Sequence, residues 1–144
     1  MASRAAVILA AGMGTRMRST LPKVLHPVGG RPVLDYSLEL AKELNCDPIV
    51  CVASPRSKAL TDYVATHIGP GGLALQETPE GTGHAVKCAA PNIGDHEGHL
   101  VVLYGDSPLI RAETIEALFK ELDAGAAIGV LGFEAEDPGM YGRL

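Results

Sequence analysis

A glycine-containing loop that follows an apolar run most constrains what this chain can fold into. Residues 5–9 (AAVIL) predict a buried strand, and the segment LAAGMGTRM at residues 9–17 continues from its carboxyl end. In an open α/β sheet, ligands bind at the carboxyl ends of the strands. Gly12 and Gly14 let the main chain approach a bulky anion, because a Cβ atom there would collide with it. Successive backbone N–H groups in such a turn can also form a concave anion site.

Three cations lie close to these glycines in the sequence, namely Arg16, Arg18 and Lys23. A tight turn with solvated basic side chains is the simple alternative, but the preceding strand favours phosphate binding. The loop is not a Walker loop, which has a longer spacer between its glycines, and Met17 stands where the dinucleotide fingerprint has glycine or alanine. Guanidinium groups beside a glycine turn suit a triphosphate, whose charge must be neutralised in several places. The loop therefore predicts a nucleoside-triphosphate site outside the Walker class.

The overall charge argues against nucleic acid as the main partner. The 144 residues carry a formal net charge of −5, whereas phosphate backbones are bound by basic surfaces. Cys46, Cys51 and Cys88 include no Cys-x-x-Cys pair, so we expect free thiols in a reducing compartment. We expect no signal peptide and no membrane span, and therefore a cytoplasmic protein.

Apolar runs alternate with helical patterns along the chain. We expect strands at residues 5–9, 49–53, 73–76, 100–104 and 127–133, and helices at about 32–44, 57–67, 82–90 and 112–122. This alternation is typical of an α/β fold with a mostly parallel sheet and helices on both faces. The sequence stops soon after the turn at residues 137–139, just as another element begins. We therefore expect the fold to be truncated, with the last edge of the sheet uncovered.

A carboxylate follows the fourth expected strand. Asp106 comes directly after residues 100–104, and so should lie on the same rim of the sheet as the glycine loop. Mg²⁺ prefers one or two carboxylates together with substrate phosphate oxygens. The alternative is an aspartate that bonds to its own backbone in a turn. The glycine loop on the same rim favours the metal role.

The segment after the third expected strand suits a nucleotide base. The amide of Gln76 both donates and accepts, and so can read a pyrimidine edge. Gly81 and Gly83 would let a flat base lie against the main chain, and Thr82 between them is expected to cap the following helix. The alternative is a capped helix with Gln76 merely polar at a strand end. For His84, in the first turn of that helix, ligand contact and packing are both open.

Five segments together resemble bacterial N-acetylglucosamine-1-phosphate uridylyltransferases. They are LAAGMGTRM (9–17), LPKVLHP (21–27), GTGHA (81–85), LYGD (103–106) and DP (137–138) with YGR (141–143). The resemblance implies a Rossmann-like nucleotide-diphospho-sugar transferase fold, with residues 1–144 forming the N-terminal portion of the pyrophosphorylase domain. In this family a left-handed β-helix acetyltransferase domain usually follows, and it assembles the enzyme as a homotrimer. That domain would lie outside this chain.

The resemblance also implies a reaction, the transfer of a uridylyl group from UTP to N-acetylglucosamine-1-phosphate. The product, UDP-N-acetylglucosamine, is a precursor of peptidoglycan and lipopolysaccharide. Implied nucleotide contacts are Leu9, Ala10, Ala11, Gly12, Gly14, Lys23, Gln76, Gly81 and Thr82. Implied substrate contacts are Tyr104, Gly105, Asp106 and Gly142. The implied catalytic cations are Arg16 and Lys23, and the implied Mg²⁺ ligand is Asp106.

Part of the family's machinery would lie beyond Leu144, including later sugar-binding positions and a second metal-binding asparagine. Three alternatives to uridylyl transfer by this chain stay open. The first is another nucleotidyltransferase of the same fold, acting on molybdopterin or a different sugar phosphate. The second is a nucleotide-binding fragment without turnover. The third is a purely structural piece of a larger assembly, which would bind no nucleotide.

Overall fold

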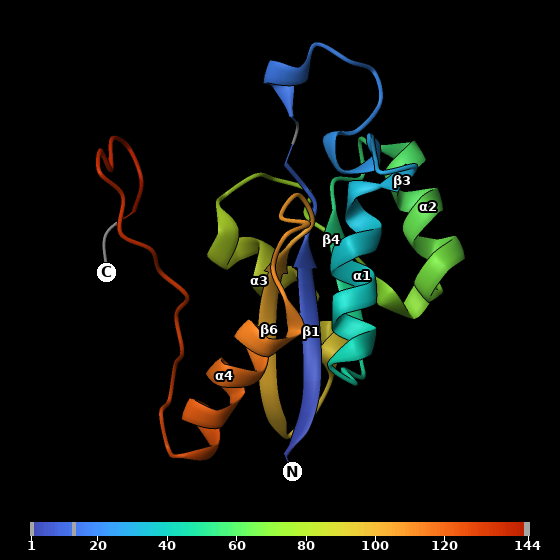
Figure 1. The fold of residues 1–144 in the computed structure, drawn as a ribbon. Coiled ribbons are helices and arrows are strands. Elements are labelled where there is room, and N and C mark those ends of the chain that lie inside the picture. Colours follow the sequence, from blue (N-terminus) through green and yellow to red (C-terminus); the bar gives the residue numbers. More distant parts are fainter. Residues whose placement is uncertain (1, 13, 143–144) are drawn as a thin grey trace.

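The computed structural model describes residues 2–12 and 14–142 (Figure 1). Its centre is a four-stranded sheet in the order β5-β4-β1-β6. The strands are β1 (Ser3–Leu9), β4 (Ile49–Ala53), β5 (Leu73–Leu75) and β6 (Gly98–Tyr104). All three pairings are parallel, with β4 on one side of β1 and β6 on the other. The carboxyl ends of all four strands therefore meet at one edge of the sheet.

Helices cover both faces of this sheet. They are α1 (Val33–Glu43), α2 (Lys58–Ile68), α3 (Thr82–Ile93) and α4 (Ala112–Asp123). Successive side chains of a strand point to opposite faces, so β1 contributes to two cores. Ala6 and Ile8 pack in the core that includes α1, α2 and α4, whereas Val7 packs in the core that includes α3. The predicted α/β class, with a parallel sheet between helical layers, is confirmed.

Several short elements were not anticipated from the sequence. A two-stranded hairpin joins β2 (Pro27–Val28) to β3 (Arg31–Pro32). Its turn residues Gly29 and Gly30 have φ angles of +60° and +86°, as a two-residue hairpin turn with left-handed central positions requires. The described residues also form three 3₁₀ turns: η1 (Thr15–Met17), η2 (Lys23–Leu25) and η3 (Pro70–Gly72).

The predicted fifth strand at residues 127–133 is wrong. These residues form irregular chain after α4, which in Figure 1 runs away from the sheet. A strand needs a neighbour to complete its backbone hydrogen bonds, and in the described residues β6 remains the edge of the sheet. The apolar side chains that suggested a strand stay in solvent; Ile128 is 80% exposed and Phe133 is 73% exposed.

No helix in the described part of the chain has both the length and the apolar character that a bilayer span requires.

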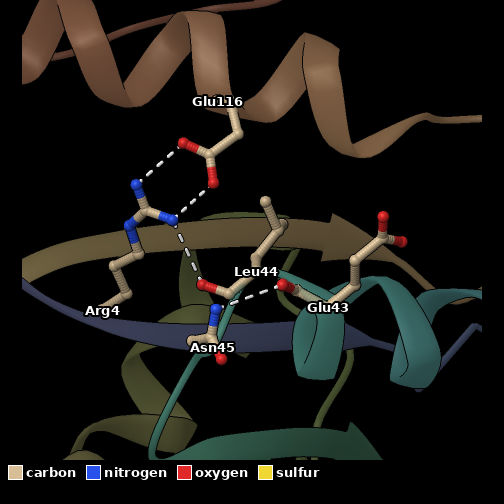
Figure 2. A network of polar contacts seen from close by, with 5 residues as sticks. All are labelled: Arg4, Glu43, Leu44, Asn45 and Glu116. Carbon is tan, nitrogen blue, oxygen red and sulfur yellow. Dashed lines mark hydrogen bonds and ion pairs between the residues drawn. The ribbon is translucent and has the colours of Figure 1, made fainter.

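One arginine joins three elements at the amino end of β1 (Figure 2). Arg4 donates from Nη1 to Glu116 Oε1 (2.6 Å) and from Nη2 to Glu116 Oε2 (2.8 Å). Its Nη1 also donates to the carbonyl oxygen of Leu44 (3.2 Å), just after α1. The guanidinium carbon lies 4.3 Å from the ring centroid of Phe119 on α4. The hydrogen bond from Arg4, together with its charge, lowers the pKa of the Glu116 carboxyl below its ordinary value.

This ion pair predicts how stability depends on acid. Because the pKa of Glu116 is lower in the folded than in the unfolded chain, the pair stabilises the fold above the unfolded pKa. That contribution is lost as pH falls through the folded pKa. We therefore expect the free energy of unfolding of Glu116→Gln to fall less steeply than that of the wild type between about pH 7 and pH 3. Urea unfolding followed by circular dichroism measures this slope.

Glu113→Gln is the matched control on the same helix. The Glu113 side chain is 82% exposed, and its Oε2 atom lies 3.9 Å from Arg111 Nε, so its removal should leave the wild-type slope. Identical acid dependence in the wild type and Glu116→Gln would contradict the role given to the Arg4 pair.

Candidate functional site

Three loops are held in register at the carboxyl edge of the sheet. Each continues the parallel hydrogen-bond ladder by one residue beyond its strand. The backbone N–H groups of Ala10, Gln76 and Gly105 donate to the carbonyl oxygens of Val52, Ala53 and Leu9, respectively, each at 2.9 Å. Loop residues that follow β1, β5 and β6 therefore start from fixed positions beside one another.

These loops enclose a cavity of about 650 Å³, within the usual size of a small-molecule site. It is lined by Leu9, Ala10, Ala11, Gly12, Gly14, Arg16, Met17, Lys23, Val24, Gln76, Pro79, Gly81, Thr82, Ala85, Tyr104 and Asp106. All the predicted site residues are in this set except Gly105 and Gly142. Met17, Val24, Pro79 and Ala85 line the cavity without having been predicted. Their side chains are small or apolar, so nothing about them in the sequence indicates a role in binding or catalysis.

The two exceptions lie elsewhere for different reasons. Gly105 is buried behind the lining, where a Cβ atom would lie 3.1 Å from Leu34 Cδ1 and 3.2 Å from the Leu9 carbonyl oxygen. Its glycine lets the end of β6 approach β1 and α1. Gly142 is exposed in the irregular chain after α4. Met13 and Arg143, which belong to the segments quoted for the family resemblance, lie outside the described residues.

The two loop glycines serve different purposes. Gly14 has a φ of +55°, and a Cβ atom there would lie 2.7 Å from Lys23 Cβ. It therefore allows the loop to fold against the start of η2. At Gly12 a Cβ atom would meet no atom within 4 Å, so this glycine leaves open space beside the cavity. The expectation that a glycine keeps room for an anion therefore fits Gly12 but not Gly14.

Charge in the cavity lining is concentrated in two cations and one carboxylate. Lys23 Nζ lies 2.6 Å from Asp106 Oδ2, with the two side chains 44% and 36% exposed. Arg16 lines the same cavity, whereas the exposed Arg18 does not. An ion pair this exposed contributes at most about 1 kcal/mol to stability. Its partners can therefore separate at little cost when another charged group enters.

Asp106 fits a metal ion only in combination with a ligand. The described residues contain no group of three or more His, Cys, Asp or Glu side chains arranged for metal binding. Mg²⁺ sites that serve phosphate chemistry usually take one or two carboxylates, with phosphate oxygens and waters completing the shell. Asp106 alone suits that arrangement, provided that Lys23 shares or releases the carboxylate.

The loop that connects β5 to α3 enters the helix one residue earlier than predicted. The N-cap of α3 is Gly81, with a φ of 97°, and no side chain caps this helix. The carbonyl oxygen of Gly81 accepts the first helical hydrogen bond, from the backbone N–H of Ala85 (3.1 Å). The predicted capping role of Thr82 is therefore wrong, because Thr82 is already the first helical residue.

Gln76 is buried at this loop, with 6% of its surface exposed. Its Nε2 atom lies 3.1 Å from the carbonyl oxygen of Gly81 and 3.1 Å from His84 Nδ1. The sequence left the role of His84 open, and the structure places it against the amide of Gln76. Nothing in the sequence spacing indicated this contact, because it depends on how the loop turns at Gly81.

Comparison with known proteins gives the class of this chain. Residues 6–142 match the family model of the MobA-like NTP transferase domain. The chain therefore belongs to the MobA-like NTP transferase family.

Within that class, the chain is homologous to about the N-terminal 31% of bacterial bifunctional GlmU proteins. It is 55% identical to "Bifunctional protein GlmU" of Hyphomonas neptunium, over 98% of this chain and 31% of that protein. It is 49% identical to the protein of the same name from Maricaulis maris, over 99% of this chain and 31% of that protein. The chain thus spans 31% of the length of these relatives.

Solved structures share the fold. Rv0371c from Mycobacterium tuberculosis has a TM-score of 0.69 at 21% identity, over 86% of this chain and 62% of that one. A UDP-glucose pyrophosphorylase from Acinetobacter baumanii has a TM-score of 0.67 at 22% identity, over 85% of this chain and 53% of that one. These likenesses support the nucleotidyltransferase-like fold.

The two loop glycines provide a test of the site's construction. Gly14→Ala places a Cβ atom in a left-handed conformation against Lys23, so we expect it to lower the free energy of unfolding by about 1–2 kcal/mol. Gly12→Ala meets no neighbour and should change the free energy of unfolding by less than about 0.5 kcal/mol. Urea unfolding of both variants measures the difference. Equal losses in the two variants would show that the loop is not held against Lys23.

Proposed function

We propose that this chain binds UTP at the carboxyl edge of its sheet and belongs to an enzyme that transfers the uridylyl group to N-acetylglucosamine-1-phosphate. The products are UDP-N-acetylglucosamine and pyrophosphate. The observation that carries the proposal is the cavity itself, which gathers the glycine loop, Arg16, Lys23, Gln76 and Asp106. Homology to GlmU and the family resemblance supply the nucleotide and the sugar phosphate.

The charges of the cavity support a triphosphate. Arg16 and Lys23 enter from the glycine loop and η2, so two cations can meet the phosphate chain at separate points. Entry of phosphates would draw Lys23 away from Asp106, because charge-assisted bonds to phosphate oxygens are strong. The Asp106 carboxylate would then be available to a divalent cation.

A divalent ion at Asp106 would neutralise part of the phosphate charge. The proposed ion is Mg²⁺, held jointly by the carboxylate and the nucleotide. A manganese complex of Rv0371c, which has this fold at 20% identity, supports a divalent metal in the fold.

The proposed reaction requires that the attacking and leaving groups are aligned and that the phosphate charge is neutralised. The attacking oxygen of the sugar phosphate is already ionised near neutral pH, so attack on the α-phosphorus of UTP needs no general base. The protein must hold attacker and leaving pyrophosphate in line and reduce the repulsion between them. Arg16 and Lys23, both in the cavity lining, are proposed to do this on the phosphate side.

Different parts of the cavity lining are proposed to contact the uracil and the sugar. Gln76, Gly81 and Thr82 lie together at one part of the cavity lining, and are proposed to read the uracil. Tyr104 and Asp106 line the cavity at the end of β6, and are proposed to meet the sugar. Gly105 would act through the position it gives to these neighbours. A sugar contact by Gly142 would require the chain after α4 to approach the cavity.

A second candidate is a related nucleotidyltransferase with another nucleotide or acceptor, favoured by the description of the matching family as MobA-like. A third is nucleotide binding without turnover, favoured because the chain spans 31% of its GlmU relatives. Measurements of nucleotide binding and of turnover on the same chain distinguish both candidates from the main proposal.

The test compares UTP, GTP and CTP by calorimetry with Mg²⁺ present. We expect UTP to bind most tightly. Arg16→Ala should weaken UTP binding roughly tenfold or more, since a hydrogen bond to a charged group is worth about 1.5–3 kcal/mol. In a chain that turns over, Arg16→Ala or Asp106→Ala should abolish pyrophosphate release with N-acetylglucosamine-1-phosphate while leaving the fold intact.

Arg18→Ala is the matched control, because Arg18 is a neighbouring cation that does not line the cavity. It should leave UTP affinity unchanged. UTP binding without pyrophosphate release would favour the fragment, and tighter binding of GTP or CTP would favour the related transferase. Equal effects of Arg16→Ala and Arg18→Ala would contradict the phosphate role of Arg16.

A further inference from the structure

The orientation of the Gln76 amide follows from its neighbours. Its Nε2 atom lies 3.1 Å from the backbone carbonyl oxygen of Gly81. A carbonyl oxygen can only accept a hydrogen bond, so the amide atom that faces it must be the nitrogen. No described residue donates a hydrogen bond to the amide oxygen, Oε1. That oxygen is therefore the polar atom that Gln76 can offer to a ligand.

The same geometry determines which nitrogen of His84 carries the proton. Gln76 Nε2 is a donor, and His84 Nδ1 lies 3.1 Å from it, so Nδ1 must accept and carries no proton. The proton of the neutral ring is then on Nε2. That nitrogen lies 3.8 Å from Cys88 Sγ and 4.0 Å from Glu80 Oε2. Both hydrogens of the Gln76 amide are consequently bound within the protein, one by Gly81 and one by His84.

We infer that His84 is a positioning residue for base selection, an inference that rests on the proposed nucleotide site. By accepting from Gln76, it holds the amide with Oε1 available to the cavity. A pyrimidine with an N3–H donor, such as uracil, can bond to that oxygen. Cytosine has an acceptor nitrogen at the same place and an amino group instead of the O4 acceptor. The fixed amide therefore favours uracil and repels cytosine, as sites built on hydrogen bonds do.

A purely structural role for His84 predicts something different. If the ring only packs on α3 beside Cys88, its replacement would change stability, and the preference between two nucleotides with the same phosphates would stay the same. The ratio of the Kd values for CTP and UTP is therefore the decisive readout. It also cancels any effect on the phosphate side of the cavity.

The experiment measures this ratio by calorimetry on the 144-residue chain with Mg²⁺. His84→Phe keeps a ring but removes the acceptor, so the amide loses one of its two anchors and can rotate. We expect the CTP/UTP ratio to fall about tenfold, the effect of one hydrogen bond. His84→Asn keeps an acceptor close to the position of Nδ1 and should retain most of the ratio. His67→Phe, at an exposed histidine of α2, is the matched control and should leave the ratio unchanged.

Inorganic tripolyphosphate separates failure of this inference from failure of the proposed function. If the wild type binds tripolyphosphate but binds UTP and CTP equally, base selection by Gln76 and His84 is overturned while the phosphate site stands. If it binds neither nucleotide nor tripolyphosphate, the proposed nucleotide site and this inference both fall. An unchanged ratio in a folded His84→Phe also overturns the inference. Should His84→Phe fail to fold, His84→Ala gives the same comparison, because alanine suits a helical position.

Discussion

Parallel pairing on both sides of β1 is the constraint on which the rest of the structure depends. Its residues are in register with β4 along one edge and with β6 along the other. Neighbouring strands lie about 4.8 Å apart, so the loops after these strands must begin side by side. Ala10 and Gly105 continue the two ladders beyond β1. The glycine loop and the carboxylate of Asp106 are thus brought together by backbone hydrogen bonds before any side chain of the cavity contributes.

Contacts with α1 also hold the carboxyl edge of the sheet in place. Ser37 on α1 donates from Oγ to the carbonyl oxygen of Tyr104 (2.9 Å), and Gly105 lets Leu34 approach the end of β6. At the opposite end of β1, Arg4 connects the strand to α4 and to the residue after α1. The cavity therefore rests on a framework whose positions are determined by packing and by hydrogen bonds outside the cavity. The side chains that line the cavity can therefore serve ligand binding instead of holding the framework together.

Local patterns in the sequence predicted most of the framework, and failures arose where structure depends on distant partners. Within the described residues, the strands β1, β4, β5 and β6 and the helices follow from apolar runs and apolar periodicity, which are local properties. Residues 127–133 have the same composition as a strand but no neighbour to pair with, and so remain irregular. Gln76 and Asp106 were predicted as site residues because parallel topology collects strand ends at one edge, whereas lining residues such as Tyr104 came from the family resemblance alone. The Lys23–Asp106 and Gln76–His84 contacts were not, since each joins side chains whose distance is set by loop conformation.

Two polar contacts in the cavity lining, Gln76–His84 and Lys23–Asp106, differ in a way that matches what each end of the proposed nucleotide would require. Gln76 is buried, and leaving a buried donor without an acceptor costs about 1–3 kcal/mol. This cost stabilises one orientation of its amide. Lys23 and Asp106 are more exposed, and their pair is worth at most about 1 kcal/mol, so it could be exchanged for contacts with the proposed phosphates and metal ion. Reading a base needs fixed donors and acceptors, whereas neutralising phosphates needs charges that can be released. Burial on one side of the cavity and exposure on the other supply these two properties within a single site.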